Sequence, residues 1–162
     1  MQLRPAVPAD AEALRAIYNT EVLRSTATFD VVPRTVEDQA RWMAEHEGAH
    51  PAVVAVDDGG TVVGFGSLSY YRDRHAYATT AENSVYVAEG HRGDGVGRAL
   101  LEELVHLAVQ HGFHTLIARV GSENEASVRL HQACGFEVVG VEREIGRKFN
   151  RWLDVRVLQR IL

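Results

Sequence analysis

Cysteine and long apolar runs are nearly absent from this sequence of 162 residues. Cys134 is its only cysteine, which excludes an internal disulfide and any cysteine-rich metal site. The longest aliphatic runs, such as Ala52 to Val56, fall far short of the ~18 residues that span a bilayer. The first residues, Met1 to Pro5, lack the apolar stretch of a signal peptide. We therefore expect a soluble, cytoplasmic protein with no membrane partner.

Basic residues are also scarce. The chain has 17 Lys and Arg against 22 Asp and Glu, for a net charge of −5, and Lys148 is its one lysine. Proteins that bind nucleic acid usually carry a surplus of positive charge, because their phosphate contacts come from cations. The composition therefore predicts no nucleic-acid partner. We attribute most arginines to genomic base composition and look for one or two that bind an anion in a bidentate way.

The hydrophobic content, by contrast, is ordinary for a folded protein. The chain is 46% hydrophobic and 24% charged, close to the globular average. Its length fits one domain and is too short for two ordinary ones. No internal repeat, Pro- or Ser-rich linker or long single-sign charge block marks a boundary. We expect a single domain over residues 1–162.

Hydrophobic periodicity and turn residues predict an alternation of strands and helices. Strands are expected at 2–6, 52–56, 61–71, 76–87, 115–120, 137–144 and 152–158. Helices are expected at 8–23, 35–47, 96–110 and 125–134. Thr35 and Asp38 have the spacing of a capping box at the start of the second helix. This order of elements indicates a mixed α/β sheet with helices packed on it.

A glycine-rich loop, Arg92-Gly93-Asp94-Gly95-Val96-Gly97, separates a predicted strand from the longest predicted helix. Glycine has no Cβ, so the backbone of such a loop can approach a ligand closely. The first turn of the following helix has unpaired N–H groups and the positive end of the helix dipole. Together these features predict a cradle for a phosphate or pyrophosphate.

Two common phosphate motifs do not fit this loop. The dinucleotide fingerprint G-x-G-x-x-G, counted from Gly93, needs a glycine where the chain has Arg98. A Walker loop needs a lysine followed by Ser or Thr, and no lysine lies nearby. A tight turn without any ligand stays open as an alternative, although three glycines just ahead of a helix are costly unless they are used.

Arg92-x-x-Gly95-x-Gly97 resembles the Q/R-x-x-G-x-G/A pyrophosphate motif of the GCN5-related N-acetyltransferases, or GNAT family. The order of predicted elements is also similar to that of the family from end to end. The resemblance implies an α/β GNAT fold, with a mixed, mostly antiparallel central sheet of about seven strands flanked by four helices. It also implies acetyl-CoA as co-substrate.

The resemblance assigns the cofactor-binding residues one by one. In that family the strand before the loop pairs with the pantetheine arm, and the loop and helix start bind the pyrophosphate. Asn124 with Ser127, followed by Gly135-Phe136, is similar to the family's N-x-x-S/A…GF segment, whose Asn amide bonds the pantetheine. The implied cofactor contacts are Val85, Tyr86, Val87, Arg92, Gly93, Asp94, Gly95, Val96, Gly97, Arg98, Asn124 and Ser127.

Three longer stretches resemble one branch of the family. They are Ile17-Tyr18-Asn19 with Ser25 to Asp30, Thr80 to Val87, and Ser127 to His131 with Gly135-Phe136. They are similar to phosphinothricin N-acetyltransferases and to methionine sulfoximine/sulfone acetyltransferases. The resemblance implies direct acetyl transfer to the α-amino group of a small amino-acid-like substrate. An acetyltransferase for a protein N-terminus or another amine, and a non-catalytic acyl-CoA-binding module, stay open as alternatives.

Acetyl transfer to an amine requires an unprotonated nitrogen, and a free α-amino group titrates near ~8 or above. A carboxylate base assists by removing the proton. The resemblance places this base at Glu82, on the strand that flanks the thioester. The alternative is a solvated strand glutamate or an ion-pair partner. A backbone N–H near Val87 is expected to stabilise the oxyanion.

The leaving thiolate needs a proton or solvation. Family members often carry a tyrosine acid at the position of His131, so this chain departs from that pattern. Imidazole titrates near neutral pH, and we expect His131 to act as the general acid. The alternative is a histidine that packs on its neighbours. For Cys134 we expect a buried core thiol and not a nucleophile.

Substrate recognition is expected from arginines and aromatic side chains. Arg72 and Arg74 come just before the central strand, where this branch binds its substrate, and arginine pairs with carboxylate or phosphinate in a bidentate way. The alternative for both is a solvated loop arginine. Phe29 and Tyr86 are candidates for the pocket wall, or else core residues.

Metal binding is not expected. His111 and His114 are three residues apart, but Gly112 breaks the helix between them and no carboxylate or thiolate completes a ligand set. The resemblance also implies a homodimer, with the C-terminal strands as its expected place.

Overall fold

The structure, a computed structural model, describes residues 1–162. Its strands are β1 (Gln2–Pro5), β2 (Ala52–Val56), β3 (Val62–Tyr70), β4 (Thr80–Val87), β5 (Thr115–Gly121), β6 (Glu137–Lys148) and β7 (Arg151–Ile161). Its helices are α1 (Ala11–Arg24), α2 (Val36–Glu45), α3 (Val96–Gln110) and α4 (Glu125–Ala133), with short 3₁₀ turns at Pro8–Asp10, His75–Tyr77 and Glu89–His91. No helix combines the length and apolar character that crossing a membrane requires.

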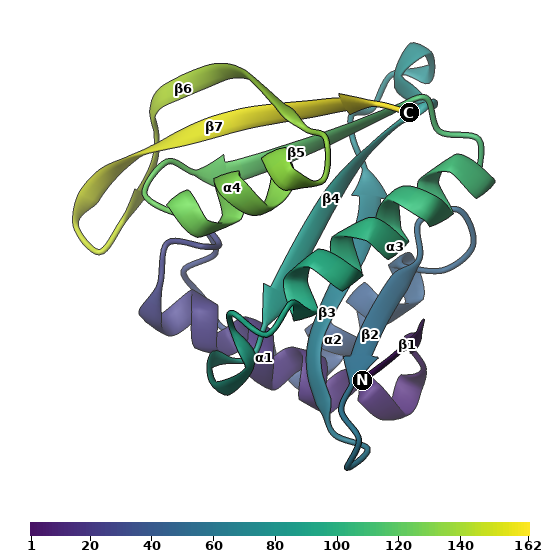
Figure 1. Ribbon diagram of the computed structural model, residues 1–162. Helices are drawn as coiled ribbons and strands as arrows, with labels where there is room; N and C mark the ends of the chain where they lie inside the picture. Colours follow the sequence, from purple (N-terminus) through teal and green to yellow (C-terminus); the bar gives the residue numbers. More distant parts are fainter.

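All seven strands form one sheet in the order β1-β2-β3-β4-β5-β7-β6. Every neighbouring pair is antiparallel except β4 and β5, which are parallel. Helices α3 and α4 cover one face of the sheet and α1 and α2 the other (Figure 1). The mixed, mostly antiparallel sheet flanked by four helices that the sequence predicts is therefore confirmed.

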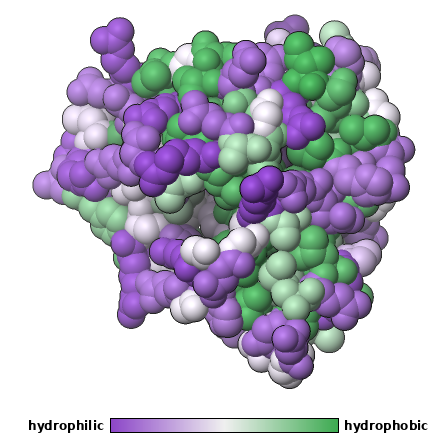
Figure 2. Space-filling model, viewed as in Figure 1, coloured by the Kyte–Doolittle hydropathy of each residue, from purple (hydrophilic) through white to green (hydrophobic).

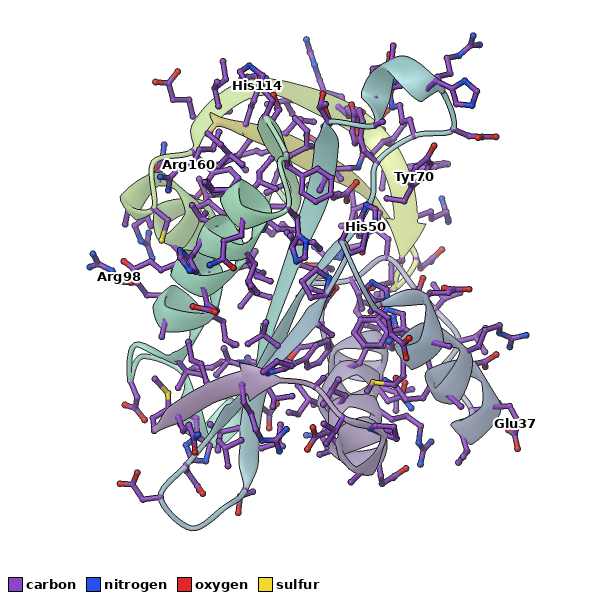
Figure 3. All side chains as sticks on the ribbon, turned by 90° about the vertical axis from the view of Figure 1, so that its right-hand side faces the viewer. Glu37, His50, Tyr70, Arg98, His114 and Arg160 are labelled. Atoms are coloured by element: carbon purple, nitrogen blue, oxygen red, sulfur yellow. The ribbon has the colours of Figure 1, made fainter.

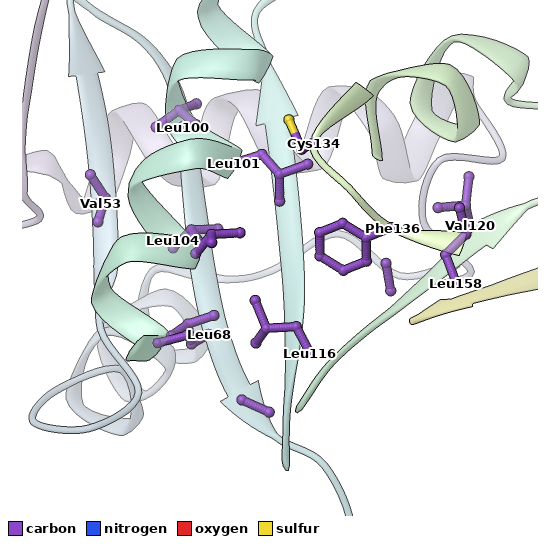
Figure 4. Packing of buried hydrophobic residues seen from close by; sticks show 14 of the residues in the cluster. Val53, Leu68, Leu100, Leu101, Leu104, Leu116, Val120, Cys134, Phe136 and Leu158 are labelled. Atoms are coloured by element: carbon purple, nitrogen blue, oxygen red, sulfur yellow. The ribbon is translucent and has the colours of Figure 1, made fainter. Parts of the chain in front are cut away.

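Two apolar cores lie on the two faces of the sheet. Because side chains alternate along a strand, Val53 of β2 joins the core under α3 while Val54 joins the core under α1. The larger core packs the apolar stripe of α3 against the sheet, with Phe136 and Leu158 at its far side (Figure 4). The stripe predicted from the sequence is buried at all six positions: Val96, Leu100, Leu101, Leu104, Val105 and Ala108.

Two glycines of β3 let α3 lie directly on the strand backbone. A Cβ on Gly66 would lie 2.9 Å from Leu104 Cδ1, and a Cβ on Gly64 would lie 3.0 Å from the Tyr86 carbonyl oxygen. Strand β3 runs through both glycines, as the strand predicted at 61–71 does. Their lack of side chains fixes the position of α3 and brings its first turn to the end of β4.

The predicted strand at 76–87 is wrong for its first residues. His75–Tyr77 forms a 3₁₀ turn and β4 begins only at Thr80. The partner strand β3 ends at Tyr70, so residues before Thr80 have no backbone to pair with. The capping box of α2 is confirmed, since the Asp38 amide donates to Thr35 Oγ1 at 3.0 Å.

Candidate active site

Strands β4 and β5 pair only over their first residues. Their register ends where Glu82 lies opposite Ile117. Beyond that point β4 stays paired with β3 as far as Val87, and β5 stays paired with β7 as far as Gly121. The two strands therefore diverge toward the start of α3 (Figure 1), and we call the space between their unpaired ends the notch.

The free edge of β4 presents backbone groups to this notch. The amide of Ala88 donates to the Val63 carbonyl on β3 at 2.9 Å. Amides alternate between the two edges of a strand, so those of Val85 and Val87 face the notch and not β3. An extended ligand arm lying along β4 would find a free amide donor at both residues and a free carbonyl acceptor at Val85.

The glycine-rich loop adds a second set of free amides. Gly93 and Gly95 have φ angles of 90° and 83°, in the left-handed region that favours glycine. The first helical hydrogen bond of α3 runs from the Ala99 amide to the Gly95 carbonyl at 3.0 Å. The amides of residues 96–98 therefore have no acceptor within the protein. This arrangement matches the anion cradle predicted from the sequence.

A cleft of about 750 Å³ joins the notch to the loop and reaches the end of α1 and the start of α4. Figure 2 shows the hollow on this face of the molecule. Two of the predicted cofactor contacts are not part of its lining: Asp94 is exposed beside it, and the Val96 side chain lies in the core, leaving only its amide. The other ten line the cleft: Val85, Tyr86, Val87, Arg92, Gly93, Gly95, Gly97, Arg98, Asn124 and Ser127.

The cleft has a basic rim whose cations are held by carboxylates. Arg92 pairs with the buried Glu21, and its Nε donates to the Val87 carbonyl at 3.3 Å. Arg98 bonds Glu102 at 2.8 Å and points outward at the surface (Figure 3). Motif reasoning missed three further basic side chains of the lining, because they lie outside the loop in sequence: Arg24, His91 and Arg151.

Asn124 both caps α4 and lines the cleft. Its Oδ1 accepts from the Ser127 amide at 3.1 Å and so caps α4. Its amide nitrogen makes no hydrogen bond within the protein and belongs to the cleft lining. One side chain therefore starts the helix and leaves a donor for a ligand.

Glu82 lies on the other face of β4, beside α1 and α2. Tyr86, on the same face, packs edge-on against Tyr18 of α1 with ring centroids 5.2 Å apart. Burial raises the pKa of Glu82 above its ordinary value, while Arg119 acts most strongly in the opposite sense. Arg119, which the sequence analysis did not single out, donates to Glu142 of β6 at 2.9 Å. A partly desolvated carboxylate beside the point where β4 and β5 separate is suited to take a proton.

The two predicted substrate arginines differ in placement. Arg72 is close enough to Glu82 to act on its carboxylate, and its guanidinium lies 5.0 Å from the centre of the Tyr71 ring. Arg74 is exposed, and its side chain makes no hydrogen bond or ion pair. The structure brings Arg72 near Glu82, whereas Arg74 does not act on that carboxylate.

The Phe29 ring packs over two glycines, Gly146 of β6 and Gly121 of β5. A Cβ on Gly146 of β6 would overlap Cδ2 and Cε2 of its ring, and a Cβ on Gly121 would lie 3.7 Å from Cε1. The loop that carries Phe29 is held from below by Lys148, whose Nζ donates to the Thr28 carbonyl at 2.8 Å. Phe29 is half-buried and belongs to neither apolar core, so part of its ring remains on the surface of the protein.

A second cavity of about 50 Å³ lies at the closed end of the notch, and His131 is part of its lining. The His131 ring is 3% exposed, with Nδ1 2.8 Å from the Ser127 carbonyl and Nε2 2.9 Å from Asn83 Nδ2. Burial lowers the pKa of His131, so the ring is neutral near pH 7. Its one proton is donated to Ser127, and none is directed at the notch. This arrangement does not fit the general acid that the sequence analysis expects.

Comparison with known proteins agrees with this architecture. A family model described as "Acetyltransferase (GNAT) domain" matches residues 3–157. The chain belongs to the GNAT acetyltransferase family. The matched segment includes the notch and the glycine-rich loop. No group of three or more His, Cys, Asp or Glu side chains is arranged to hold a metal ion.

Two curated GNAT relatives cover nearly the whole chain. A phosphinothricin N-acetyltransferase of Streptomyces coelicolor is 39% identical, over 100% of this chain and 96% of its own length. An L-methionine sulfoximine/L-methionine sulfone acetyltransferase of Pseudomonas paraeruginosa is 37% identical, over 97% of this chain and 92% of its own length.

Two solved structures also resemble this chain over nearly its whole length. A ribosomal-protein-alanine N-acetyltransferase from Brucella melitensis has a TM-score of 0.96 and 38% identity, over 100% of both chains. A phosphinothricin acetyltransferase from Sinorhizobium meliloti, solved in complex with AcCoA, has a TM-score of 0.95 and 39% identity, over 99% of this chain and 88% of its own.

Proposed function

We propose that this protein transfers the acetyl group of acetyl-CoA directly to the α-amino group of a small amino-acid-like substrate. The acceptor class is that of phosphinothricin, methionine sulfoximine and methionine sulfone, as in the relatives' names. The observation that carries the proposal is the notch between β4 and β5, which begins just past Glu82, the last residue of β4 paired with β5, and joins the cleft of the anion cradle.

The cofactor side of the proposal rests on unpaired backbone groups. The free amides of residues 96–98 and the positive end of α3 suit the pyrophosphate. The free groups of Val85 and Val87 suit the pantetheine amides, and the Asn124 amide nitrogen adds a further donor. Acetyl-CoA supplies an activated thioester, and these residues hold it along β4.

On the acceptor side, Glu82 takes a proton from the substrate ammonium, directly or through a water. The freed nitrogen attacks the thioester carbon, a C–N bond forms and the C–S bond breaks. The notch-facing amide of Val85, the nearer of the two to Glu82, stabilises the charge on the thioester oxygen. The leaving sulfur takes up the second proton that the amine nitrogen loses as the amide forms, and Glu82 releases the first proton to solvent, so atoms and charges balance over the cycle.

The test is a thiol-release assay with acetyl-CoA. The panel contains amino acids, their sulfone, sulfoximine and phosphinate analogues, and a short peptide with an N-terminal alanine. We expect turnover with one or more of the small analogues and little with the peptide. Acetylation of the peptide alone would contradict the proposal and support the activity named for the Brucella melitensis structure.

Arg72 and Arg74 offer a matched pair for substrate binding. We expect Arg72→Met to raise KM for the amino-acid substrate about tenfold, because a lost charge-assisted hydrogen bond costs roughly 1.5–3 kcal/mol. The KM for acetyl-CoA should not change. Arg74→Met serves as the control, since its side chain is exposed and makes no hydrogen bond or ion pair. Equal effects of the two substitutions would contradict a specific role for Arg72.

The same proposal includes a homodimer formed through the hairpin of β6 and β7. Strand β6 is an edge of the sheet, so its outer backbone groups are free to pair with a second copy. The hairpin also exposes six large apolar side chains: Val138, Val139, Val141, Ile145, Phe149 and Trp152. A two-fold axis through such a patch would bury it against itself.

The homodimer is tested by sedimentation equilibrium. We expect the wild type to have twice the chain mass of 17.9 kDa, and Val141→Glu with Ile145→Glu to have the mass of one chain. Val109→Glu on α3 is the control, because Val109 is equally exposed but lies outside the hairpin. A wild type that sediments as a single chain would contradict the proposal.

A further inference from the structure

The small cavity at the closed end of the notch contains a buried acceptor without a partner. Asn83 is 4% exposed and follows Glu82 on β4, so the two side chains leave the strand on opposite faces. Its Oδ1 has no hydrogen bond, and Asn83 lines the cavity of about 50 Å³. A buried oxygen without a donor is costly, so we expect a ligand to supply that donor.

The direction of the Asn83 amide is set by its neighbours. The Ser127 carbonyl can only accept, so the proton of the neutral His131 ring is on Nδ1, 2.8 Å away. His131 Nε2 is then an acceptor, and the Asn83 nitrogen must be the atom that faces it at 2.9 Å. The Asn83 oxygen is left as the free atom. Ser127, His131 and Asn83 thus form a chain that holds one acceptor in place.

The position of Asn83 indicates which part of the ligands it meets. Val87 lies at the phosphate end of the free β4 edge, and Asn83 is four residues away, ~13 Å along a strand. A pantetheine arm along this edge brings the reacting end to Asn83. The pantetheine amides pair with the backbone of β4, and the acetyl thioester has only acceptor atoms, so the donors left for Asn83 are the N–H of the acceptor amine and the S–H of the product thiol. The N–H is the stronger donor.

We propose that Asn83 is a catalytic residue whose Oδ1 accepts a hydrogen bond from the acceptor amine, which it orients toward the thioester carbon. Glu82 and Asn83 then approach the amine from the two faces of β4, one to take a proton and the other to hold an N–H. His131 is a positioning residue and supplies no proton. This inference rests on the proposed N-acetyltransferase activity.

Three variants test the inference against acetyl-CoA and whichever amine the wild type accepts. Asn83→Leu removes the acceptor at similar volume, and we expect kcat/KM for the amine to fall about tenfold to a hundredfold. The KM for acetyl-CoA should change less than about twofold. Thermal melting establishes that the variant is folded, which is expected because the substitution removes an unsatisfied oxygen.

His131→Gln and His131→Leu separate positioning from acid catalysis. Glutamine keeps an oxygen that accepts from the Asn83 nitrogen, so His131→Gln should retain kcat within about threefold and keep the wild-type pH profile. His131→Leu removes that acceptor and should resemble Asn83→Leu. Loss of turnover in His131→Gln, together with loss of the basic limb of the pH profile, would overturn the positioning role.

Two other outcomes would overturn the assignment of Asn83. If Asn83→Leu is folded and its kcat/KM is unchanged, the oxygen meets only water. If the variant binds CoA at least tenfold more weakly by calorimetry, while acetyl-CoA binding and the KM for the amine are unchanged, the donor is the thiol and not the amine. A wild type that accepts no amine contradicts the proposed function itself, so this failure is distinguishable from the other two.

Discussion

Replacing Glu82 with glutamine is expected to lower kcat by about 100-fold or more while acetyl-CoA binding stays near normal. Glutamine preserves the size of the side chain but cannot take a proton. Glu82 faces the acceptor side of β4, whereas the cofactor cleft is lined by the edge of that strand and by the glycine-rich loop. Turnover by thiol release and binding by calorimetry therefore report on different sides of the notch.

The pH profile gives a second reading of the same variant. A base works only when it is ionised, so wild-type kcat/KM should fall as pH drops through the pKa of Glu82. Burial raises that pKa above the usual carboxylate range, so this acidic limb should lie above the position expected for a solvated glutamate. In Glu82→Gln the limb should disappear. Glu45→Gln, an exposed substitution on α2, is the matched control. Unchanged turnover in Glu82→Gln would remove the residue from the mechanism.

Replacing Gly95 with valine is expected to raise the Kd for acetyl-CoA at least about tenfold. Gly95 has a φ of 83°, a region that a β-branched residue almost never occupies. Valine would force this backbone to rearrange, and the free amides of residues 96–98 follow directly after it. Since those amides form the anion cradle, their misplacement weakens binding of the pyrophosphate. Calorimetry with acetyl-CoA measures the effect.

Gly60 is a matched control for this substitution. It has a φ of 86° in the turn between β2 and β3, and a Cβ there would meet no other atom, as at Gly95. Gly60→Val therefore carries the same backbone strain away from the cleft. We expect it to lower the melting temperature but leave the Kd for acetyl-CoA unchanged. If both variants lose affinity equally, the effect of Gly95→Val is general destabilisation and not loss of the cradle.

The sequence predicted those elements whose conformation depends on neighbouring residues in the chain. The bounds of α3 match the sequence prediction, because a helical apolar stripe begins after Gly95 and stops at Gly112. The strand predicted from Ala76 failed because residues 71–79 have no neighbouring strand, and a single sequence does not contain that information. Likewise, β6 extends to Lys148 because β7 pairs with it, although its pattern fades earlier.

The acidic and basic residues of the acceptor face could not be assigned from sequence in the same way. Arg72 and Arg74 both precede the same predicted strand, so the sequence does not distinguish them. In the structure only Arg72 acts on the Glu82 carboxylate. Arg119 reaches Glu142 across 23 residues of sequence. Contacts of this kind depend on which strands become neighbours, and that is a property of the whole sheet.

By itself, the sequence determined the family, the sheet with its helices, and the loop whose glycines and following helix make an anion cradle. These depend on periodicity, φ preferences and motif spacing, all of which act over a few residues. Only the tertiary structure decided that β4 and β5 diverge after Glu82, that His131 is buried and neutral, and that Asn83 holds a free oxygen at the end of the notch. Asn83 and His131 are 48 residues apart, and packing of α4 against the diverging strands is what brings them together.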